Sequence, residues 1–175
     1  TLEYLETKGF EVTYLDVEEN GIINPNKIKD AIKDNTILIS VMYANNEIGT
    51  IINLKELGDV CRKYNVYLHT DACQSYTKTE LDVNKQPVDL ITLNAHKIHG
   101  PKGVGVLYIR KNTKIMSWQH GGGHEFGMRS GTENISGAVG FAKATELALN
   151  KKHVEHMSKL RDKLIKGLLE IPETR

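Results

Sequence analysis

The 175 residues include 23 Lys and Arg against 22 Asp and Glu, a formal net charge of +1, and 39% of them are hydrophobic. This balance is typical of a globular domain, and it argues against nucleic acid or an acidic membrane as the main partner, because neutralising many phosphates requires an excess of cations. Two cysteines, Cys61 and Cys73, are too few for a disulfide framework. The sequence contains no run of about 18 apolar residues, the length that a membrane-spanning helix requires. We therefore expect a cytoplasmic protein.

Short β-rich runs alternate with segments of helical period along most of the chain. The run ILISVM is nearly continuous in large or β-branched residues, as expected of a strand covered on both faces in a mostly parallel sheet. We expect an α/β fold with five strands, at Glu11 to Leu15, Thr36 to Met42, Val66 to Thr70, Asp89 to Leu93 and Val104 to Ile109.

The helical segments differ in position. Apolar residues recur at helical spacing around Ile28 and again from Leu54 to Tyr64, between the predicted strands. From Asn134 onward the pattern is helical only, and it predicts helices at Ile135 to Leu149 and Val154 to Leu169. The chain therefore combines a sheet region with a helical final segment.

Polar residues directly follow three of the predicted strands. In open α/β sheets, ligands bind beyond the carboxyl ends of the strands. An acid, a lysine and several hydrogen-bonding groups at one such rim would suit an anionic aromatic cofactor. Taken singly, an acid there could equally cap a helix and a lysine could be an exposed loop cation. The candidates are Asn45, Asn46, Glu47, Asp71, Gln74, Asn94, His96 and Lys97.

The segment NAHKIHGPKGVG, residues 94–105, predicts a tight irregular loop between two strands. Its glycines permit positive φ and close backbone approach, and its positive charge suits a phosphate. A lysine held near another cation and partly desolvated loses basicity, which an imine-forming lysine requires.

Three strings, TDACQS, NAHKIHGPKGVGVLYIR and HGGGHEFGMRSGTEN, resemble the cysteine desulfurases of the NifS/IscS type. These are pyridoxal-phosphate (PLP) enzymes of fold type I in the class V aminotransferase family. The resemblance runs from about Thr1 to Lys143. It implies that residues 1–133 form an incomplete central part of the mostly parallel-sheet large domain, and that residues 134–175 lead toward a small C-terminal domain. It also implies L-cysteine as substrate, a sulfur-acceptor or iron–sulfur scaffold protein as partner, and a homodimer.

The resemblance implies a role for each matching residue. Lys97 matches the lysine that holds PLP covalently and moves a proton at the substrate Cα. Asp71 matches the carboxylate that pairs with the pyridine nitrogen, and Gln74 the residue that bonds the phenolic oxygen. Asn46 matches a polar residue that contacts the cofactor or the substrate, and Asn94 and His96 match residues that bind the phosphate. Many relatives carry serine at the position of Asn94. Thr132 matches a threonine that reaches the phosphate of the other subunit.

A zinc site is the competing interpretation of the histidine pairs His96/His99 and His120/His124. The glycines at 121–123 would break the helix that an HExxH-type site needs, and no cluster of cysteines or carboxylates supplies a third ligand. We therefore expect no metal. For His120 and His124, a structural role in the loop is at least as good an interpretation as catalysis.

Neither cysteine matches the residue that takes up sulfur as a persulfide in this family, which lies on a later loop. Cys61 falls on the apolar face of a predicted helix, and Cys73 lies beside the cofactor residues as packing. A ring-stacking histidine and a first phosphate-binding turn are also unmatched. We expect the 175-residue chain alone to be inactive. The alternatives are a selenocysteine lyase or another class V PLP enzyme, and a non-catalytic PLP-binding fragment or degenerate relative.

Overall fold

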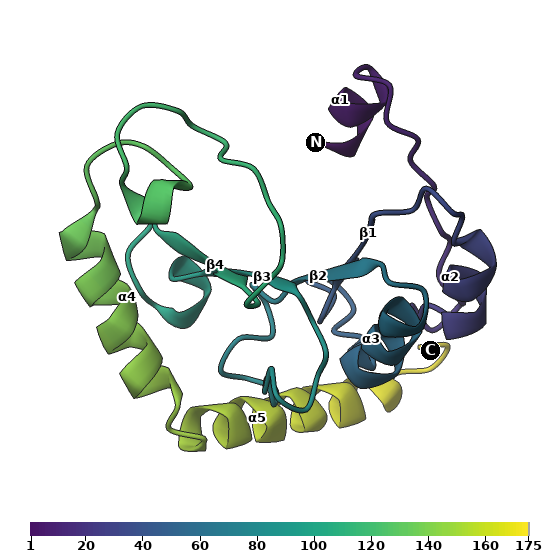
Figure 1. Cartoon of the computed structure of the whole chain (residues 1–175). Helices are drawn as coiled ribbons and strands as arrows, with labels where there is room; N and C mark the ends of the chain where they lie inside the picture. Colours follow the sequence, from purple (N-terminus) through teal and green to yellow (C-terminus); the bar gives the residue numbers. More distant parts are fainter. Residues whose placement is uncertain (175) are drawn as a thin grey trace. The chain divides into compact units, whose positions relative to one another are not determined.

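The structure is a computed structural model, and it describes residues 1–174. Its centre is a sheet of four strands in the order β1-β2-β3-β4 (Figure 1). Strands β1, β2 and β3 are parallel to one another, with Met42 and Thr92 both directly opposite Asp71. The strands are β1 (Leu38–Met42), β2 (Tyr67–Asp71), β3 (Leu90–Asn94) and β4 (Gly105–Ile109).

Strand β4 runs antiparallel to β3. The Ala95 N–H donates to the Val104 carbonyl just beyond one end of the pair, and the Arg110 N–H donates to the Asp89 carbonyl just beyond the other end. Residue numbers that rise on one strand while they fall on its neighbour define an antiparallel pair. The mostly parallel α/β sheet predicted from the sequence is thus confirmed, with one strand reversed.

The predicted strand at Glu11 to Leu15 is wrong, because residues 10–18 form no regular element. Val12 and Leu15 are half-buried while the side chains between them are exposed. A strand is stabilised by ladder hydrogen bonds to a neighbour and by burial of one face. Within residues 1–174 this segment pairs with no strand, so its β-rich composition alone does not make it one.

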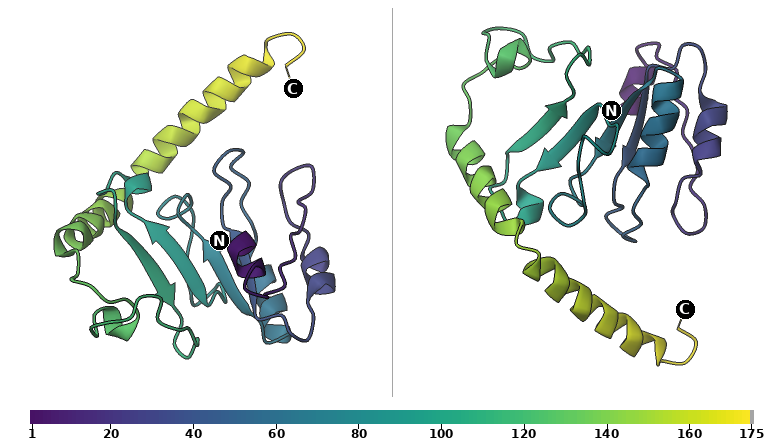
Figure 2. Two further views of the ribbon diagram at one scale, coloured as in Figure 1. Left: turned by 90° about the horizontal axis from the view of Figure 1, so that it is seen from above. Right: turned by 60° about the horizontal axis from the view of Figure 1, so that its bottom comes forward.

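The helices follow local capping signals. Asn24 caps α2 (Pro25–Ala31), and Asn53 caps α3 (Leu54–Lys63) by accepting the Glu56 N–H. Helix α3 buries Leu54, Leu57 and Cys61 on one face, and Figure 2 shows α2 and α3 side by side. The other elements are α1 (Leu2–Glu6), η1 (His96–Ile98), η2 (Glu125–Gly127), α4 (Ile135–Ala148) and α5 (Lys152–Leu169).

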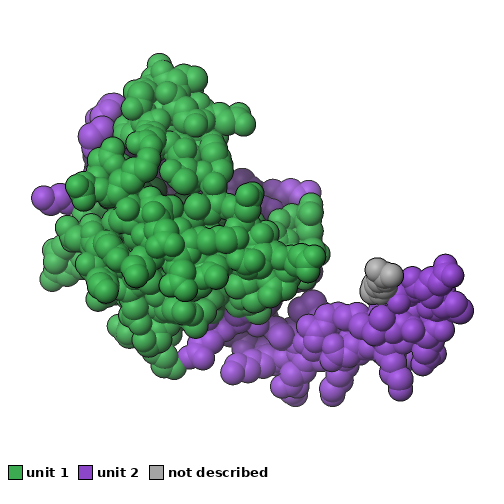
Figure 3. Space-filling view, turned by 90° about the vertical axis from the view of Figure 1, so that its right-hand side faces the viewer, with its two compact units in different colours: residues 1–74, 82–92, 107–113 green, residues 75–81, 93–106, 114–175 purple. Residues whose placement is uncertain are grey.

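The chain divides into two compact units, distinguished by colour in Figure 3. The first comprises residues 1–74, 82–92 and 107–113, and its core includes Ile28, Leu68 and Ile91. The second comprises residues 75–81, 93–106 and 114–175, and its core gathers around Phe141 and Ile98. The sequence analysis also predicts a boundary between residues 133 and 134, where the large domain would end and a segment leading to a small domain would begin. That boundary stays a prediction.

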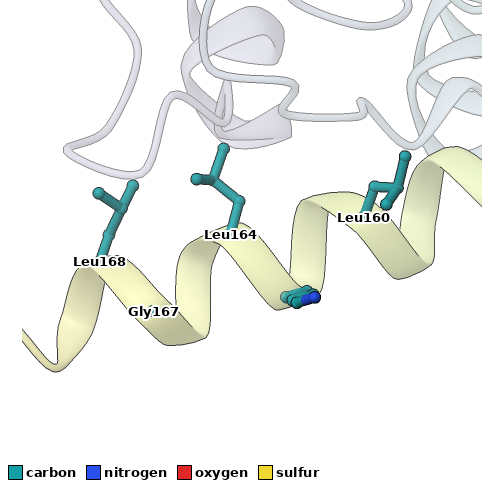
Figure 4. A pocket seen from close by; sticks show the side chains of 5 residues that line it. Leu160, Leu164, Gly167 and Leu168 are labelled. Carbon is teal, nitrogen blue, oxygen red and sulfur yellow. The ribbon is translucent and has the colours of Figure 1, made fainter.

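Helix α5 has no buried residue. Leu160, Leu164 and Leu168 lie four positions apart, are 54%, 62% and 44% exposed, and point the same way from the helix (Figure 4). With Lys163 and Gly167 they line a shallow recess made by a single helix rather than a cavity with walls from several elements. No helix within residues 1–174 combines the length and the apolar character that crossing a membrane requires.

Candidate functional site

Asp71 ends β2 in the first unit, at the carboxyl edge where ligands bind in open α/β sheets. Its Oδ1 accepts the Cys73 N–H at 2.9 Å, which closes a tight turn after the strand. The intervening Ala72 is fully buried, and its N–H donates to the Thr92 carbonyl at 3.0 Å. This turn presents a half-buried carboxylate in one defined orientation.

Two more predicted residues belong to the same unit as that carboxylate. Asn46 is exposed in the turn that follows β1. Its neighbour Asn45 is occupied differently, because its Oδ1 accepts the backbone N–H groups of Glu47 and Ile48. The structure therefore gives Asn45 a structural role in the turn and leaves Asn46 as the exposed amide. Gln74 is half-buried, directly after the Asp71 turn.

The lysine loop belongs to the second unit and begins where β3 ends. Asn94 Oδ1 accepts the Lys97 N–H at 3.2 Å, at the start of η1. Ala95 and Ile98 are buried against α4, whereas His96 and Lys97 between them are exposed. The two apolar residues hold the loop down, and the side chains of His96 and Lys97 are turned toward solvent.

A close backbone approach completes this loop. The Gly100 N–H donates to the Ala95 carbonyl at 2.9 Å, and a Cβ at Gly100 would come within 3.1 Å of the Ala95 and Ala144 Cβ atoms. His99 adopts the left-handed conformation at φ 65° to make the turn. The sequence NAHKIHGPKG therefore folds as a braced loop, as its glycines predict.

Lys78 is a residue that the sequence analysis missed. Burial first, and then the positive charge of Lys97, lower the pKa of Lys78 below its ordinary value. Lys78 is half-buried, and Tyr76 nearby anchors its segment by donating to Thr145 and packing edge-on against Phe141. Lys97 thus lies within electrostatic range of a second cation. The partial burial that the sequence analysis also expected of Lys97 is wrong, because its side chain is exposed beyond the buried backbone of the loop.

The glycine-rich histidine segment forms a self-contained loop. Ser130 is buried, and its hydroxyl donates to the Gly122 carbonyl at 2.7 Å. His124 Nδ1 accepts the Gly131 N–H at 3.3 Å. These bonds favour the structural interpretation of His124. Thr132, the predicted phosphate ligand of a second copy, follows this loop and is exposed.

The histidines are not assembled with other ligands. Among residues 1–174, no three His, Cys, Asp or Glu side chains stand close enough together to hold a metal ion.

Neither cysteine places its thiol at the surface, since Cys61 is buried and Cys73 is half-buried. Burial raises the pKa of the Cys61 thiol to about 12, so this group is protonated at neutral pH and is not a nucleophile. The half-buried Cys73 directs its thiol to the Thr92 carbonyl at 3.7 Å. Both positions agree with the packing roles predicted from the sequence.

The predicted site residues therefore fall into two sets. Each set has its own support within one unit, and the convergence of both on a single cofactor stays a prediction. The first unit holds Asn46, Asp71 and Gln74, and the second holds Asn94, His96, Lys97 and Thr132.

Comparison with known proteins adds an independent finding. Residues 2–175 match the family model described as Aminotransferase class-V. The chain is 49% identical over 178 residues to the cysteine desulfurase IscS of Clostridium botulinum, covering 100% of this chain and 45% of the relative. It is 50% identical over 176 residues to the cysteine desulfurase IscS of Methanosarcina thermophila, covering 99% of this chain and 44% of the relative.

Solved structures agree. A NifS-like protein superposes with a TM-score of 0.92 at 42% identity, covering 97% of this chain and 47% of that one. A structure described as SspA in complex with cysteine gives a TM-score of 0.80 at 39% identity, covering 83% of this chain and 42% of that one. The chain spans a little under half the length of the proteins it matches.

Proposed function

This chain belongs to the class-V aminotransferase family, and on that premise we propose that it forms the central cofactor-binding segment of a cytoplasmic PLP-dependent cysteine desulfurase. The proposed reaction converts L-cysteine to L-alanine and passes the sulfur, as a persulfide, to an acceptor protein for iron–sulfur cluster or thio-cofactor assembly. The observation that carries the proposal is that the two units present, each with its own support, an oriented carboxylate at the end of β2 and an exposed lysine on a braced loop after β3. Relatives of about half identity over the whole chain are named for this activity.

The residues present fit PLP, a planar anion with a basic ring nitrogen, a phenolic oxygen, an aldehyde and a phosphate. When bound, PLP supplies an electron sink for the electron pair left on the substrate Cα. Asp71 would hold a proton at the ring nitrogen, because a carboxylate favours the cationic form of a neighbouring base. Gln74 would donate to the phenolic oxygen, and Asn46 would contact the cofactor or the substrate.

Lys97 is proposed to do two jobs through one atom. Its Nζ would attach the cofactor covalently, and once freed it would take a proton from the substrate Cα and return it. Both jobs need a mobile side chain on a fixed backbone. The loop provides this combination, since Ile98 and Ala95 are buried while Lys97 is exposed.

Phosphate binding is assigned to Asn94 and His96, with Thr132 serving a second copy in a homodimer. The Asn94 Oδ1 already accepts the Lys97 N–H, so its side-chain NH₂ is the group that can donate to a phosphate oxygen. An asparagine can thus replace the serine of many relatives at this position.

A second candidate function is a PLP-binding chain without turnover. The protonated, buried Cys61 and the packed Cys73 favour it, because sulfur transfer requires a thiolate that attacks the substrate sulfur. We expect the 175-residue chain to bind PLP and to release no alanine from L-cysteine. Alanine release by this chain alone would exclude the second candidate.

The test is covalent labelling with PLP. After addition of PLP and reduction with borohydride, peptide mass spectrometry is expected to place the added mass on Lys97. Lys97→Ala should lose the label and the accompanying visible absorbance, whereas Lys102→Ala, at an exposed lysine of the same loop, should keep both. Equal labelling of Lys97, Lys102 and other exposed lysines would overturn the proposal.

A further inference from the structure

Three polar side chains form a continuous row across the first unit's sheet. The Ser40 Oγ lies 2.7 Å from His69 Nδ1, and His69 Nε2 lies 2.8 Å from the Thr92 Oγ1. Ser40 is directly opposite His69 in the register of β1 and β2, and Thr92 is directly opposite Asp71 in the register of β2 and β3. The row thus connects three strands through one imidazole.

This row lies on the face of the sheet that carries Asp71. Successive side chains of a strand point to opposite faces, so His69 and Asp71 share one face of β2 while Leu68 and Thr70 share the other. Leu68 and Thr70 are fully buried, and the Thr70 hydroxyl has no hydrogen-bond partner among residues 1–174. The two faces of β2 therefore differ in chemistry, and the face with the hydrogen-bonded His69 is the one that also carries Asp71.

The imidazole is held in its neutral form. Burial lowers the pKa of His69 below the ordinary histidine value, against the opposing effect of the Asp71 charge. A neutral imidazole has one donor and one acceptor nitrogen, and a hydroxyl can supply the complementary group to either. Ser40 and Thr92 therefore use both ring nitrogens, which fixes the ring and leaves no N–H for another partner.

The row is connected to the Asp71 turn through Thr92. While the Thr92 hydroxyl bonds His69, its carbonyl accepts the Ala72 N–H at 3.0 Å and the Cys73 thiol at 3.7 Å. The Cys73 N–H in turn donates to Asp71 Oδ1. His69 is thus two hydrogen-bonded steps from the backbone that orients the carboxylate.

We propose that His69 is a positioning residue for Asp71, fixing Thr92 and through it the turn that aims the carboxylate at the cofactor's ring nitrogen. The neutral state has a second consequence. A cationic imidazole on the same face would share the Asp71 charge, whereas a neutral one leaves that charge to the ring nitrogen. The inference rests on the proposed function, because it assigns His69 to the carboxylate that PLP would use.

The first test compares PLP affinity and the pH dependence of the bound cofactor's visible absorbance among variants of the full chain. His69→Leu removes both hydrogen bonds, and we expect a roughly five- to tenfold loss of PLP affinity, together with a shifted absorbance titration. His69→Gln keeps a donor and an acceptor and should recover most of both. His156→Gln, the same polar change at an exposed position of α5, should match the wild type.

The two proposals fail in different ways. Wild-type chain that does not label at Lys97 overturns the proposed function. Wild-type chain that labels at Lys97, with His69→Leu indistinguishable from the wild type in affinity and absorbance, overturns the role of His69 alone.

A second test needs no cofactor and no variant of His69. In the cofactor-free chain, NMR of the ring nitrogens is expected to show a neutral, singly protonated His69 whose pKa lies below the ordinary value. Asp71→Asn should lower the pKa of His69 further, because the carboxylate is the charge that favours its protonation. An unchanged titration in Asp71→Asn, or a doubly protonated ring at neutral pH, would overturn the inference.

Discussion

The turn at Asp71 and the loop at Lys97 solve the same problem in different ways. Each fixes a proposed site residue at the end of a strand or just beyond it. The Asp71 turn is held by hydrogen bonds to Cys73 and Thr92, and the carboxylate itself is one of the bonded groups. The Lys97 loop has backbone hydrogen bonds too, but what anchors it is the burial of Ile98 and Ala95, and the Lys97 side chain takes no part in the packing.

The difference matches the role proposed for each group. A counter-charge works by staying in place, so its own oxygen can be tied down. A lysine that binds and later moves a proton has to swing, so only its backbone can be fixed. The polar brace consists of the hydrogen bonds that join His69, Thr92 and the Asp71 turn, and the apolar brace consists of Ile98 and Ala95 packed against α4. Substitutions can disrupt one brace and leave the other intact.

Ile98→Asp should break the apolar brace. It places a carboxylate in a cluster of Ala95, Phe141 and Ala144, and we expect a loss of about 3 kcal/mol or more in the free energy of unfolding, measured in urea. Ile165→Asp on the uncovered side of α5 should cost under about 1 kcal/mol. Equal losses at the two positions would mean that Ile98 does not anchor the loop.

Asp71→Asn should separate charge from shape at the polar brace. The amide oxygen can still accept the Cys73 N–H, so stability should change little, whereas PLP affinity should fall on the order of tenfold, about 1.4 kcal/mol. Titration of PLP by absorbance measures this loss, with Asp59→Asn, at an exposed position of α3, as the control. Undiminished affinity would separate Asp71 from the cofactor.

Asn134→Ala should weaken the apolar brace indirectly. Asn134 caps α4 by accepting the Gly137 N–H at 3.0 Å, and α4 carries Phe141 into the cluster behind the lysine loop. We expect a loss of about 1 kcal/mol in urea unfolding. The same change at Asn150, which accepts the Lys152 N–H, should cost less, because α5 buries no residue. A larger loss at Asn150 would contradict this ranking.

The polar brace should also show a modest pH dependence. The pKa of His69 is lowered in the folded chain, so the unfolded chain binds a proton first as the pH falls. Stability is therefore expected to decrease as the pH drops below about 6.5, the ordinary histidine value, toward the lower folded pKa. His69→Gln should flatten this decrease, as seen in unfolding midpoints between pH 7 and pH 5. An identical slope in the variant would assign the decrease to other groups.

Most of the fold could be predicted from periodicity and motifs. Four of the five predicted strands and the two C-terminal helices are present within two residues of their expected bounds. The family resemblance carried by TDACQS and NAHKIHGPKGVG is confirmed by a family match over residues 2–175. Residues 11–15 failed because pairing is not a local property, and no periodicity indicates whether a neighbouring strand exists.

The site was predicted unevenly. Motif residues such as Asp71 and Lys97 could be predicted because the family resemblance assigns a role to each matching position of the sequence. The support beneath them could not be named, since it depends on register. His69 carried a weak signal, because it lies two residues before Asp71 on a strand and must share its face, but only the register shows that Ser40 and Thr92 bracket it. Lys78 carried no signal, since its proximity to Lys97 arises from tertiary structure.

The leucine row of α5 affects the affinities and unfolding midpoints of the chain, because its side chains are exposed. Leu160, Leu164 and Leu168 give this chain an apolar stripe in contact with water. Such stripes drive association as the protein concentration or the salt rises. Apparent affinities and unfolding midpoints should therefore drift with dilution, and Leu164→Lys should remove the drift while leaving the labelling of Lys97 intact.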